Sequence, residues 1–471
     1  MTFHSGSKTK STRSTFRGAA YISSVRHSIF VLSAVAVSAL GFASAASAES
    51  LRDALSRAYT NNPQINQQRA SLRAADENVP LARSGFLPNI HGRISGSTSN
   101  TDGVGSSRAS AGIQVDQNLF NGFRTVNSIR QAEAGVRATR AGLANTELGI
   151  MRAGAIAYIN VLRDQQLVSL QRSNLAFLDE QVRAARARFD VGEGTRTDIA
   201  TAQAQQAAAR ASISSAEATL RISEAQYRQI IGASPTNLQS VRVPTHLIPS
   251  SLARAREIAL SRHPAIKAQQ YAADSQKFGV KIAEGALLPS LDLTGALTAV
   301  TTTTPQGSFN EASVTATLTI PLFAGGRNYA NVRQAKQNLS AERIGVDRTR
   351  DEIRLNIEEA WAQLQAARAA VSANRAQLEA GRLALEGVVE ERNVGQRTTL
   401  DVLSSQRTVN DARIGLAQAQ ANQKAAAFAV AAATGRLTAR SMGLGVKYYD
   451  DRAHYEQVKD KWYGLRTPSG Q

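Results

Sequence analysis

Few residues of this sequence have the types and spacing that catalysis requires. It contains no nucleotide-binding P-loop, no Gly-x-Ser-x-Gly turn of the kind that presents a nucleophilic serine, and no His-Glu-x-x-His zinc motif. The histidines at positions 91, 246, 263 and 454 stand far apart and unpaired. The absence of cysteine excludes disulfides, thiolate metal sites and a cysteine nucleophile. We therefore expect no enzyme activity, no metal site and no cofactor.

The acidic residues that stand out are two aspartates that follow similar glycine turns. Val191-Gly192 precedes Asp198, and Val394-Gly395 precedes Asp401 with the same spacing. A carboxylate shortly after a glycine turn is typical of a helix N-cap or a first helical turn, where the helix dipole favours negative charge. The two motifs therefore predict two helical hairpins, each with an aspartate at the start of its second helix.

These turns belong to a duplication that runs from Leu51 to about Leu437. A period near 200 residues is too long for a solenoid unit, so we predict two homologous halves around a pseudo-twofold axis. The first repeat is 49–235, a proline-containing linker follows at 236–250, and the second repeat is 251–437. The other matching anchors are Asn62-Pro63 with His263-Pro264, Phe86-Leu87-Pro88 with Leu287-Leu288-Pro289, and Leu119-Phe120-Asn121-Gly122 with Leu322-Phe323-Ala324-Gly325. The tail, 438–471, is expected to be an external strap or partly disordered.

Residues 1–48 have the features of a secretory signal peptide. A basic stretch without acids is followed by an apolar run over 28–42 and by Ala46-Ser47-Ala48, a small-x-small cleavage pattern. A retained membrane anchor would need about 20 apolar residues, and this run is shorter and broken by serines. The mature chain should begin at Glu49. Since no later apolar stretch has spanning length, any membrane insertion must use strands.

The chain is strongly basic, with 55 Lys and Arg against 37 Asp and Glu and a formal net charge of +18. Such a charge is common in nucleic-acid-binding proteins. Export and the scattered positions of the arginines argue instead for a solvated surface that faces anionic lipid and the periplasm. We expect no nucleic-acid partner.

Two-residue periodicity follows each of the prolines Pro88 and Pro289. Apolar and polar residues alternate in 290–301 and 311–322. In the weaker first copy they alternate well over 109–115, whereas 91–99 is mostly Ser, Thr and Gly. Segments of about ten to twelve residues with apolar-out, polar-in alternation suit tilted strands that cross a bilayer. A soluble hairpin with one buried face is the alternative for the strands alone.

Long helices follow the strands. Residues 121–189 and 325–392 contain no proline, and each would form a helix of about 100 Å. In the second, small and apolar residues recur with the alternating 4 and 3 spacing of a coiled coil. The seam comprises Ile353, Ile357, Ala360, Leu364, Ala367, Val371, Asn374, Leu378, Gly381, Leu385 and Val388. Return helices are expected to begin near 196 and 399. The summed length of a return helix and the helix before the strands nearly equals the length of one long helix, so each repeat should build one continuous and one broken strut.

Together these features resemble the TolC family of outer-membrane channel proteins. The resemblance rests on the exported, duplicated order of helix, strands and long helix, on Leu-Phe-x-Gly before each long helix, and on Val-Gly-x-Arg-Thr-Thr-Leu-Asp at 394–401. It implies an α+β membrane protein whose long α-helical coiled coils form a tunnel. It also implies a homotrimer with a transmembrane β-barrel of four strands per chain and twelve in all, in the outer membrane of a Gram-negative bacterium.

The same resemblance implies a passive exit duct for efflux or type I secretion. Its partners would be a periplasmic adaptor protein, an inner-membrane pump or ABC exporter, and outer-membrane lipid. The rival hypothesis from the sequence is a soluble periplasmic coiled-coil adaptor or scaffold, which also explains the heptads and the export. That rival gives no reason for four strand segments at the same point of both copies.

The resemblance also assigns a periplasmic gate. Asp401 matches a ring of carboxylates at the tunnel entrance, while Ser404 stands where a second acid is found in the family's best-known member. Arg397, Thr197 and Asp198 match positions that tie neighbouring coiled coils together. Arg392 replaces an aromatic residue and could form an ion pair with Asp198. Two plainer interpretations stay open, namely that Asp401 caps a helix and that Arg397 is an ordinary surface arginine.

Two further groups of residues receive roles from the resemblance. The hairpin turns would be docking tips for the adaptor, although ordinary helix-hairpin turns would have the same sequence. These turn residues are Val191, Gly192, Val394 and Gly395. The strand-to-helix junctions would be formed by Leu119, Phe120, Gly122, Leu322, Phe323 and Gly325.

Overall fold

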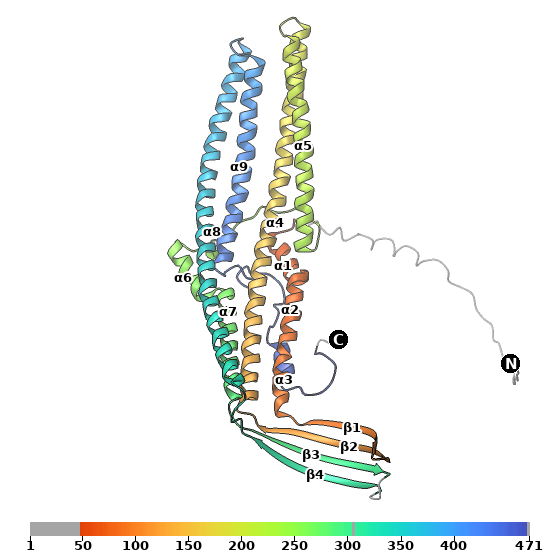
Figure 1. The fold of residues 1–471 in the computed structure, drawn as a ribbon. Helices are drawn as coiled ribbons and strands as arrows, with labels where there is room; N and C mark the ends of the chain where they lie inside the picture. The colour runs from red at the N-terminus through yellow and green to blue at the C-terminus, as the bar shows by residue number, and fades with distance from the viewer. Residues whose placement is uncertain (1–47, 304–306, 469–471) are drawn as a thin grey trace, which may run out of the picture. The chain divides into compact units, whose positions relative to one another are not determined.

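The computed structural model describes residues 48–303 and 307–468, so the predicted signal peptide lies outside the described residues except for Ala48. The two repeats contain the same order of helices and strands, except that the first has an additional short helix and a 3-10 turn before its strands (Figure 1). The first has α1 (Leu51–Asn61), α2 (Pro63–Asp76), α3 (Asn78–Arg83), the 3-10 turn η1 (Ser84–Phe86), β1 (Asn89–Thr101), β2 (Val104–Phe120), α4 (Arg124–Asp190) and α5 (Arg196–Ile231). The second has α6 (Leu252–Arg262), α7 (Pro264–Gly285), β3 (Ser290–Thr302), β4 (Phe309–Thr319), α8 (Arg327–Asn393) and α9 (Thr399–Ala433). A 3-10 turn, η2 (Thr245–Leu247), lies in the linker, and α10 (Ala453–Val458) lies in the tail.

Polar side chains and prolines start the short helices as the sequence predicts. Asn62 Oδ1 accepts the backbone N–H of Gln64 at 2.9 Å, and Pro63 occupies the first turn, where its missing N–H costs nothing. In the second repeat His263 Nδ1 accepts the N–H of Ala265 at 3.2 Å in the same way. The two repeats therefore start equivalent helices with different capping residues.

The four strands form one antiparallel sheet in the order β1-β2-β3-β4, so β1 and β4 are its edges. Serine and glycine do not prevent β1 from pairing with β2 along its whole length, because cross-strand hydroxyls bond to each other, as in Ser95 with Ser110 at 2.8 Å. β4 ends at Thr319, before the predicted limit of 322, because Pro321 lacks a ladder donor and restricts the residue before it.

The register gives the sheet one apolar and one polar face. Residues that pair directly on neighbouring strands point to the same face of the sheet. Ile90 pairs with Val115 and Ile113 pairs with Leu297, so the apolar residues of β1, β2 and β3 lie on one face. The apolar face carries Ile90 and Ile94 of β1, Ala109, Ala111, Ile113 and Val115 of β2, Leu291, Leu293, Leu297 and Ala299 of β3, and Ala312, Val314, Ala316 and Leu318 of β4. Several of these side chains are largely exposed, including Ile94 at 87% and Val314 at 79%. The opposite face is mainly Ser, Thr, Asn, Gln and charged residues.

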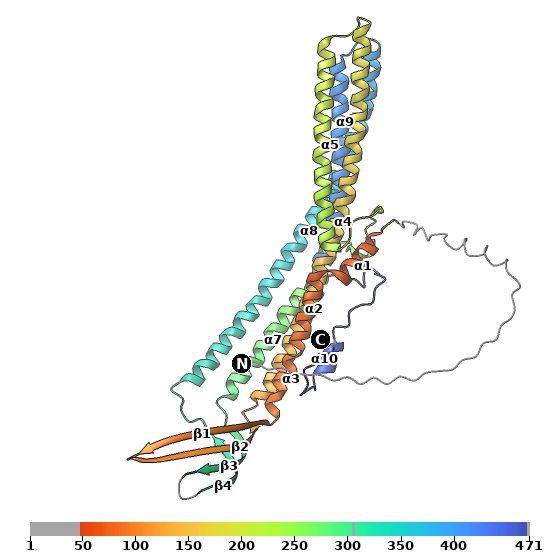
Figure 2. The ribbon, with the colours of Figure 1, turned by 90° about the vertical axis from the view of Figure 1, so that its right-hand side faces the viewer.

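The helices α4 and α8 each contain 67 residues, which corresponds to about 100 Å. α5, with 36 residues, packs along one part of α4, and α2 and α3 pack along the other. In the second repeat α9 packs along one part of α8, and α7 packs along the other (Figure 2). This arrangement confirms the predicted pairing of a continuous strut with a broken one.

The predicted heptad seam is the inner face of α8. Ile353, Ile357, Ala360, Leu364 and Leu378 are buried, and the six other seam positions are partly buried. At Gly381 of this seam an added Cβ would lie 3.6 Å from Val409 of α9, which is ordinary van der Waals contact, so α9 packs directly on the seam. None of the helices in the described part of the chain combines the length and hydropathy of a membrane span.

The largest core cluster lies where the two parts of the broken strut of the first repeat meet, and the end of α9 and the start of the tail join it. Tyr158 of α4 donates its hydroxyl proton to the carbonyls of Glu49 at 2.6 Å and Gln239 at 2.8 Å, so the expected mature N-terminus is fixed in this core. The tail joins the same cluster. Arg69 lies over the rings of Tyr59 and Tyr449, at 4.6 and 4.9 Å from their centroids.

Candidate functional site

The α4–α5 and α8–α9 turns have the same backbone geometry. Gly192 and Gly395 both adopt left-handed conformations, with φ of 81° and 80°, which glycine reaches without a Cβ penalty. The N–H of the next residue, Glu193 or Gln396, closes each turn on a helix carbonyl at 2.8 Å. The duplicated Val-Gly motif therefore ends both long helices in the same way. Val191 and Val394 project from these turns with 72% of their surface exposed.

Asp401 and Asp198 are helix-capping residues. Oδ2 of Asp401 accepts the backbone N–H of Thr398 at 2.9 Å and its hydroxyl at 2.8 Å, and Asp198 makes the equivalent pair of bonds to Thr195. Both pairs are completed capping boxes. The bond from the Thr398 backbone N–H, followed by that from its hydroxyl, lowers the pKa of Asp401 below its usual range. The capping interpretation of Asp401 is thus observed, and a carboxylate fixed in its charged form stands at this turn.

Arg397 forms an ion pair within the second hairpin. Its Nε donates to Oε2 of Glu391 at 2.7 Å, and this bond raises the pKa of Arg397. The first hairpin has no counterpart, because the matching positions hold Arg188 and Gly194. Glu391 was not among the predicted site residues, since a spacing of six residues across a turn carries no recognisable pattern.

Arg392 joins the two hairpins. Its Nη1 donates to Oε1 of Gln181 on α4 at 3.0 Å, and Gln181 is only 9% exposed. Burial, followed by the nearby Arg188, lowers the pKa of Arg392, and its Nε has no partner among the described residues. The suggested ion pair with Asp198 is not formed within this chain, because the Asp198 carboxylate caps α5 and Arg392 turns to Gln181 instead.

A small apolar contact lies beside this hydrogen bond. Leu403 of α9 packs among Leu178 and Val182 of α4 in one buried cluster. The adjacent Ser404 is exposed, as is Thr197 at the start of α5. Near their turns the two hairpins therefore meet through one leucine contact and a few polar bonds, whereas farther from the turns α9 packs against α4 and α5 in the largest core cluster.

The strand-to-helix junctions hold the remaining predicted residues. Leu119 and Phe120 end β2, whereas Leu322 and Phe323 lie between β4 and α8 and are 90% and 84% exposed. Gly122 has φ of 65°, and a Cβ there would lie 2.2 Å from the carbonyl oxygen of Gly285. Gly325 also has positive φ, but the space around it is open. No motif in the sequence indicated that Gly285 takes part in this contact.

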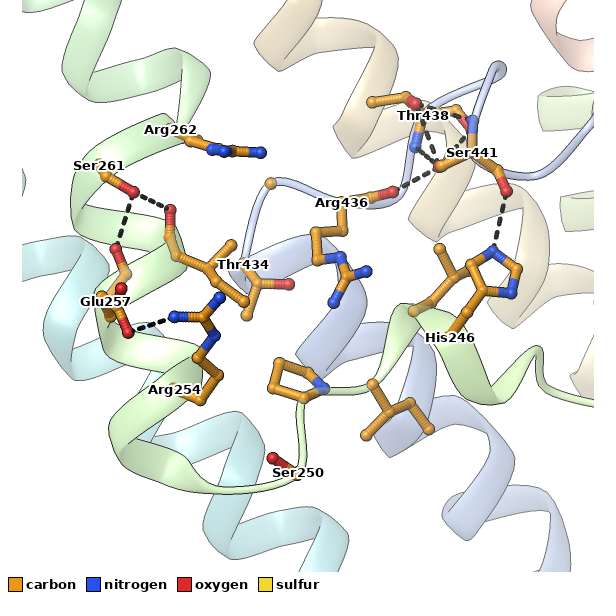
Figure 3. Close-up of a pocket in the computed structure, with 15 residues that line it drawn as sticks. His246, Ser250, Arg254, Glu257, Ser261, Arg262, Thr434, Arg436, Thr438 and Ser441 are labelled. Carbon is orange, nitrogen blue, oxygen red and sulfur yellow. Dashed lines mark hydrogen bonds and ion pairs between the residues drawn. The ribbon is translucent and has the colours of Figure 1, made fainter.

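In the described ranges no group of three or more His, Cys, Asp or Glu residues could hold a metal ion. A cavity of about 580 Å³ lies between the linker, α6 and the end of α9, and the side chains of three arginines line it (Figure 3). Glu257, the carboxylate among its lining residues, pairs with Arg254 at 2.6 Å, and His246 Nε2 contacts the carbonyl of Ser441 at 3.1 Å. This arrangement contains no nucleophile with an adjacent base.

Comparison with known proteins identifies the family of this chain. The sequence profile of the outer membrane efflux protein family matches residues 54–233 and 255–436, one match in each repeat. The chain belongs to this family. It is 44% identical to the outer membrane efflux protein BepC of Brucella suis over 429 residues, which cover 90% of this chain and 94% of BepC. It is 28% identical to TolC of Vibrio cholerae, with 81% of this chain and 90% of TolC covered.

Solved structures agree with the family assignment at the level of fold. The CmeC outer membrane channel of Campylobacter jejuni superposes with a TM-score of 0.74 at 18% identity, covering 87% of this chain and 89% of CmeC. The predicted resemblance and the predicted fold class are confirmed. The protein is an outer membrane efflux protein of a Gram-negative bacterium, with a fold that reaches into the periplasm, and its family consists of channel and efflux proteins rather than enzymes.

Proposed function

We propose that the chain assembles as a homotrimer that forms the passive exit duct of a tripartite efflux pump, a type I secretion system or both. A periplasmic adaptor protein would couple it to an inner-membrane pump or ABC exporter that supplies the energy. The observation that carries this proposal is the continuous apolar face of the four-stranded sheet, whose side chains are exposed to solvent in a single chain.

The open sheet edges require further copies of the chain. Unpaired backbone N–H and C=O groups are not tolerated in the hydrocarbon core of a membrane, yet β1 and β4 are edge strands. Pairing β4 of one copy with β1 of the next closes the sheet without any new element. Three copies give twelve strands with the apolar face toward lipid and the polar face toward a water-filled interior.

The hairpin turns form the periplasmic gate in this proposal. Three copies of Asp401 around one axis would attract cations and repel one another, which opposes the effect of the capping bonds on their pKa. Within each chain the bond from Arg392 to Gln181 holds one hairpin against the other. Opening would separate these partners, and Arg397, Ser404, Thr197 and Asp198 would lie at the surfaces that move.

The exposed turn tips fit a docking role. Val191, Val394 and Leu400 expose 72%, 72% and 59% of their surfaces at the ends of otherwise polar hairpins. Apolar tips of this kind suit the adaptor, which must contact the duct at its periplasmic entrance. A soluble adaptor or scaffold, the rival hypothesis, would have no use for an exposed apolar sheet face.

Fractionation and gel mobility test the proposal. The expressed protein should partition with outer membranes and migrate as a heat-dissociable trimer in detergent. A protein that remains in the soluble periplasmic fraction without detergent would refute the duct and favour the adaptor. Matched variants with Val314→Asp on the apolar face and Thr315→Asp on the polar face separate the two faces, because only the first should abolish membrane insertion.

A further inference from the structure

The last described residues of the tail form a basic and aromatic segment whose large apolar side chains are exposed. This terminal segment, residues 459–468, follows α10 and has no helix or strand. Trp462 and Tyr463 are each 75% exposed, and Leu465 is fully exposed. The two rings contact each other edge to face at 5.0 Å between centroids. Large apolar side chains grouped in this way are not explained by the fold of the single chain.

Charged contacts fix where this segment lies. Asp460 forms an ion pair with Arg83, the last residue of α3, and α10 packs against α2 (Figure 2). Only the 3-10 turn η1, Leu87 and Pro88 separate Arg83 from the first residue of β1. A 3-10 turn rises about 2 Å per residue, so Phe86 lies about 6 Å beyond Arg83. The terminal segment therefore begins beside the junction where helices give way to the sheet.

The junction marks the boundary of the membrane if the sheet spans it. Exposed apolar side chains gather there, including Phe86 at 52%, Phe123 at 59% and Phe323 at 84%. Tryptophan and tyrosine favour the headgroup level of a bilayer, where one end of the ring is apolar and the other is wet. Trp462 and Tyr463 thus have the right chemistry for the level at which Asp460 is held.

The charge of the segment fits the same surface. Lys461 and Arg466 have no acidic partner among the described residues. Lys459 pairs with Glu456 of α10 at 2.6 Å, whereas the single acid of the segment, Asp460, is neutralised by Arg83. Basic residues next to aromatic residues bind anionic phospholipid headgroups, and the attraction falls off within a Debye length. A protein partner would also accept aromatic residues, but the position beside the strand junction favours lipid.

We propose that the terminal segment is an interfacial anchor that lies on the phospholipid leaflet of the outer membrane facing the periplasm. Trp462, Tyr463 and Leu465 enter the headgroup region, and the basic residues contact anionic lipid. Through Asp460 and Arg83 the anchor holds α3 at the membrane surface, beside the strand junction. The inference rests on the proposed function for the sheet being membrane-spanning, and three copies in the trimer would act together.

Tryptophan fluorescence tests this proposal, because the chain has only two tryptophans. Trp361 lies 34 residues into α8, which places it about 50 Å from the start of that helix at the strand junction. Trp361→Phe leaves Trp462 as the reporter, and Trp462→Phe leaves Trp361 as the matched control. Both full-length variants are reconstituted in vesicles of phosphatidylethanolamine and phosphatidylglycerol that are brominated near the headgroup.

We expect the fluorescence emission of Trp462 to lie at shorter wavelength in vesicles, because its ring enters the headgroup region. Bromine should quench the emission of Trp462 and leave the emission of Trp361 unaffected. Lys461→Gln with Arg466→Gln should reduce the quenching of Trp462 in vesicles with phosphatidylglycerol. If Trp462 stays unquenched in vesicles through which the protein conducts ions, the anchor is refuted while the channel stands. If Trp462 is protected from a water-soluble quencher only in whole cell envelopes, a protein partner covers it, and the lipid assignment is wrong.

Discussion

The hydrogen bond from Arg392 to Gln181 gives the sharpest test of how the gate is held. We consider Gln181→Met, which keeps the volume of the side chain but removes the acceptor. Arg392 would then remain partly buried with neither its Nη1 nor its Nε bonded in the closed arrangement. Separation of the hairpins would let water reach the guanidinium. The variant should therefore favour the open gate.

The size of this shift follows from the kind of bond that is lost. A hydrogen bond to a charged group contributes about 1.5–3 kcal/mol. Since about 1.4 kcal/mol changes an equilibrium constant tenfold, each chain should shift toward the open state by about ten- to a hundredfold. Single trimers in planar bilayers should accordingly show a higher open probability and a larger mean conductance than the unmodified protein.

Two further variants make the test specific. Gln206→Met removes a hydrogen bond of 2.6 Å to Asp179, but both residues belong to the first hairpin, so conductance should not change. In the double variant Gln181→Met with Arg392→Met, both partners become apolar, which is nearly neutral, and closure should return. Our reasoning would be refuted by a Gln181→Met channel as closed as the wild type, or by equal opening with Gln206→Met.

Three other expectations concern charge, acid and backbone space. Asp401→Asn keeps a capping oxygen but removes the carboxylate, so the reversal potential in a salt gradient should show weaker cation preference, and an unchanged value would contradict the gate assignment. Burial lowers the pKa of His263 to about 4, so below pH 6.5 the unfolded chain takes up a proton more readily than the folded chain. The free energy of unfolding should therefore fall by about 3 kcal/mol as the pH decreases from 6.5 to 4. His263→Asn, which copies Asn62 of the first repeat, should abolish this acid sensitivity in thermal melts, and an unaltered pH profile would count against it. Gly122→Ala should lower the free energy of unfolding by about 1–2 kcal/mol because of its left-handed backbone, and by about 1–3 kcal/mol more because the new Cβ clashes with Gly285. Gly325→Ala should have only the first cost, because the space around it is open. Equal melting points of the two variant trimers would disprove this.

The sequence predicted the elements of the fold well because their causes are local. Absence of proline over nearly 70 residues, a heptad seam and glycine turns determine where α4 and α8 run and end. Alternation in 290–301 likewise predicted β3, and duplication supplied the weaker strands of the first copy. The end of β4 was placed three residues too late because the apolar pattern continues past Thr319, whereas Pro321 stops the ladder.

The contacts of the candidate site were harder to predict because they join distant parts of the chain. Gln181 and Arg392 are 211 residues apart, and nothing in either local sequence indicates the other. The capping role of Asp401 was predictable, since its Thr398 partner lies three residues away. The gate roles that we propose for these residues depend on neighbouring chains, which the sequence of one chain does not encode in any local pattern.

The conductance of the purified mature protein in planar bilayers, with its mass determined in detergent, tests the central claim most directly. We predict a trimer whose openings are small and cation-selective. A monomeric, soluble protein that leaves the bilayer non-conducting would contradict the account.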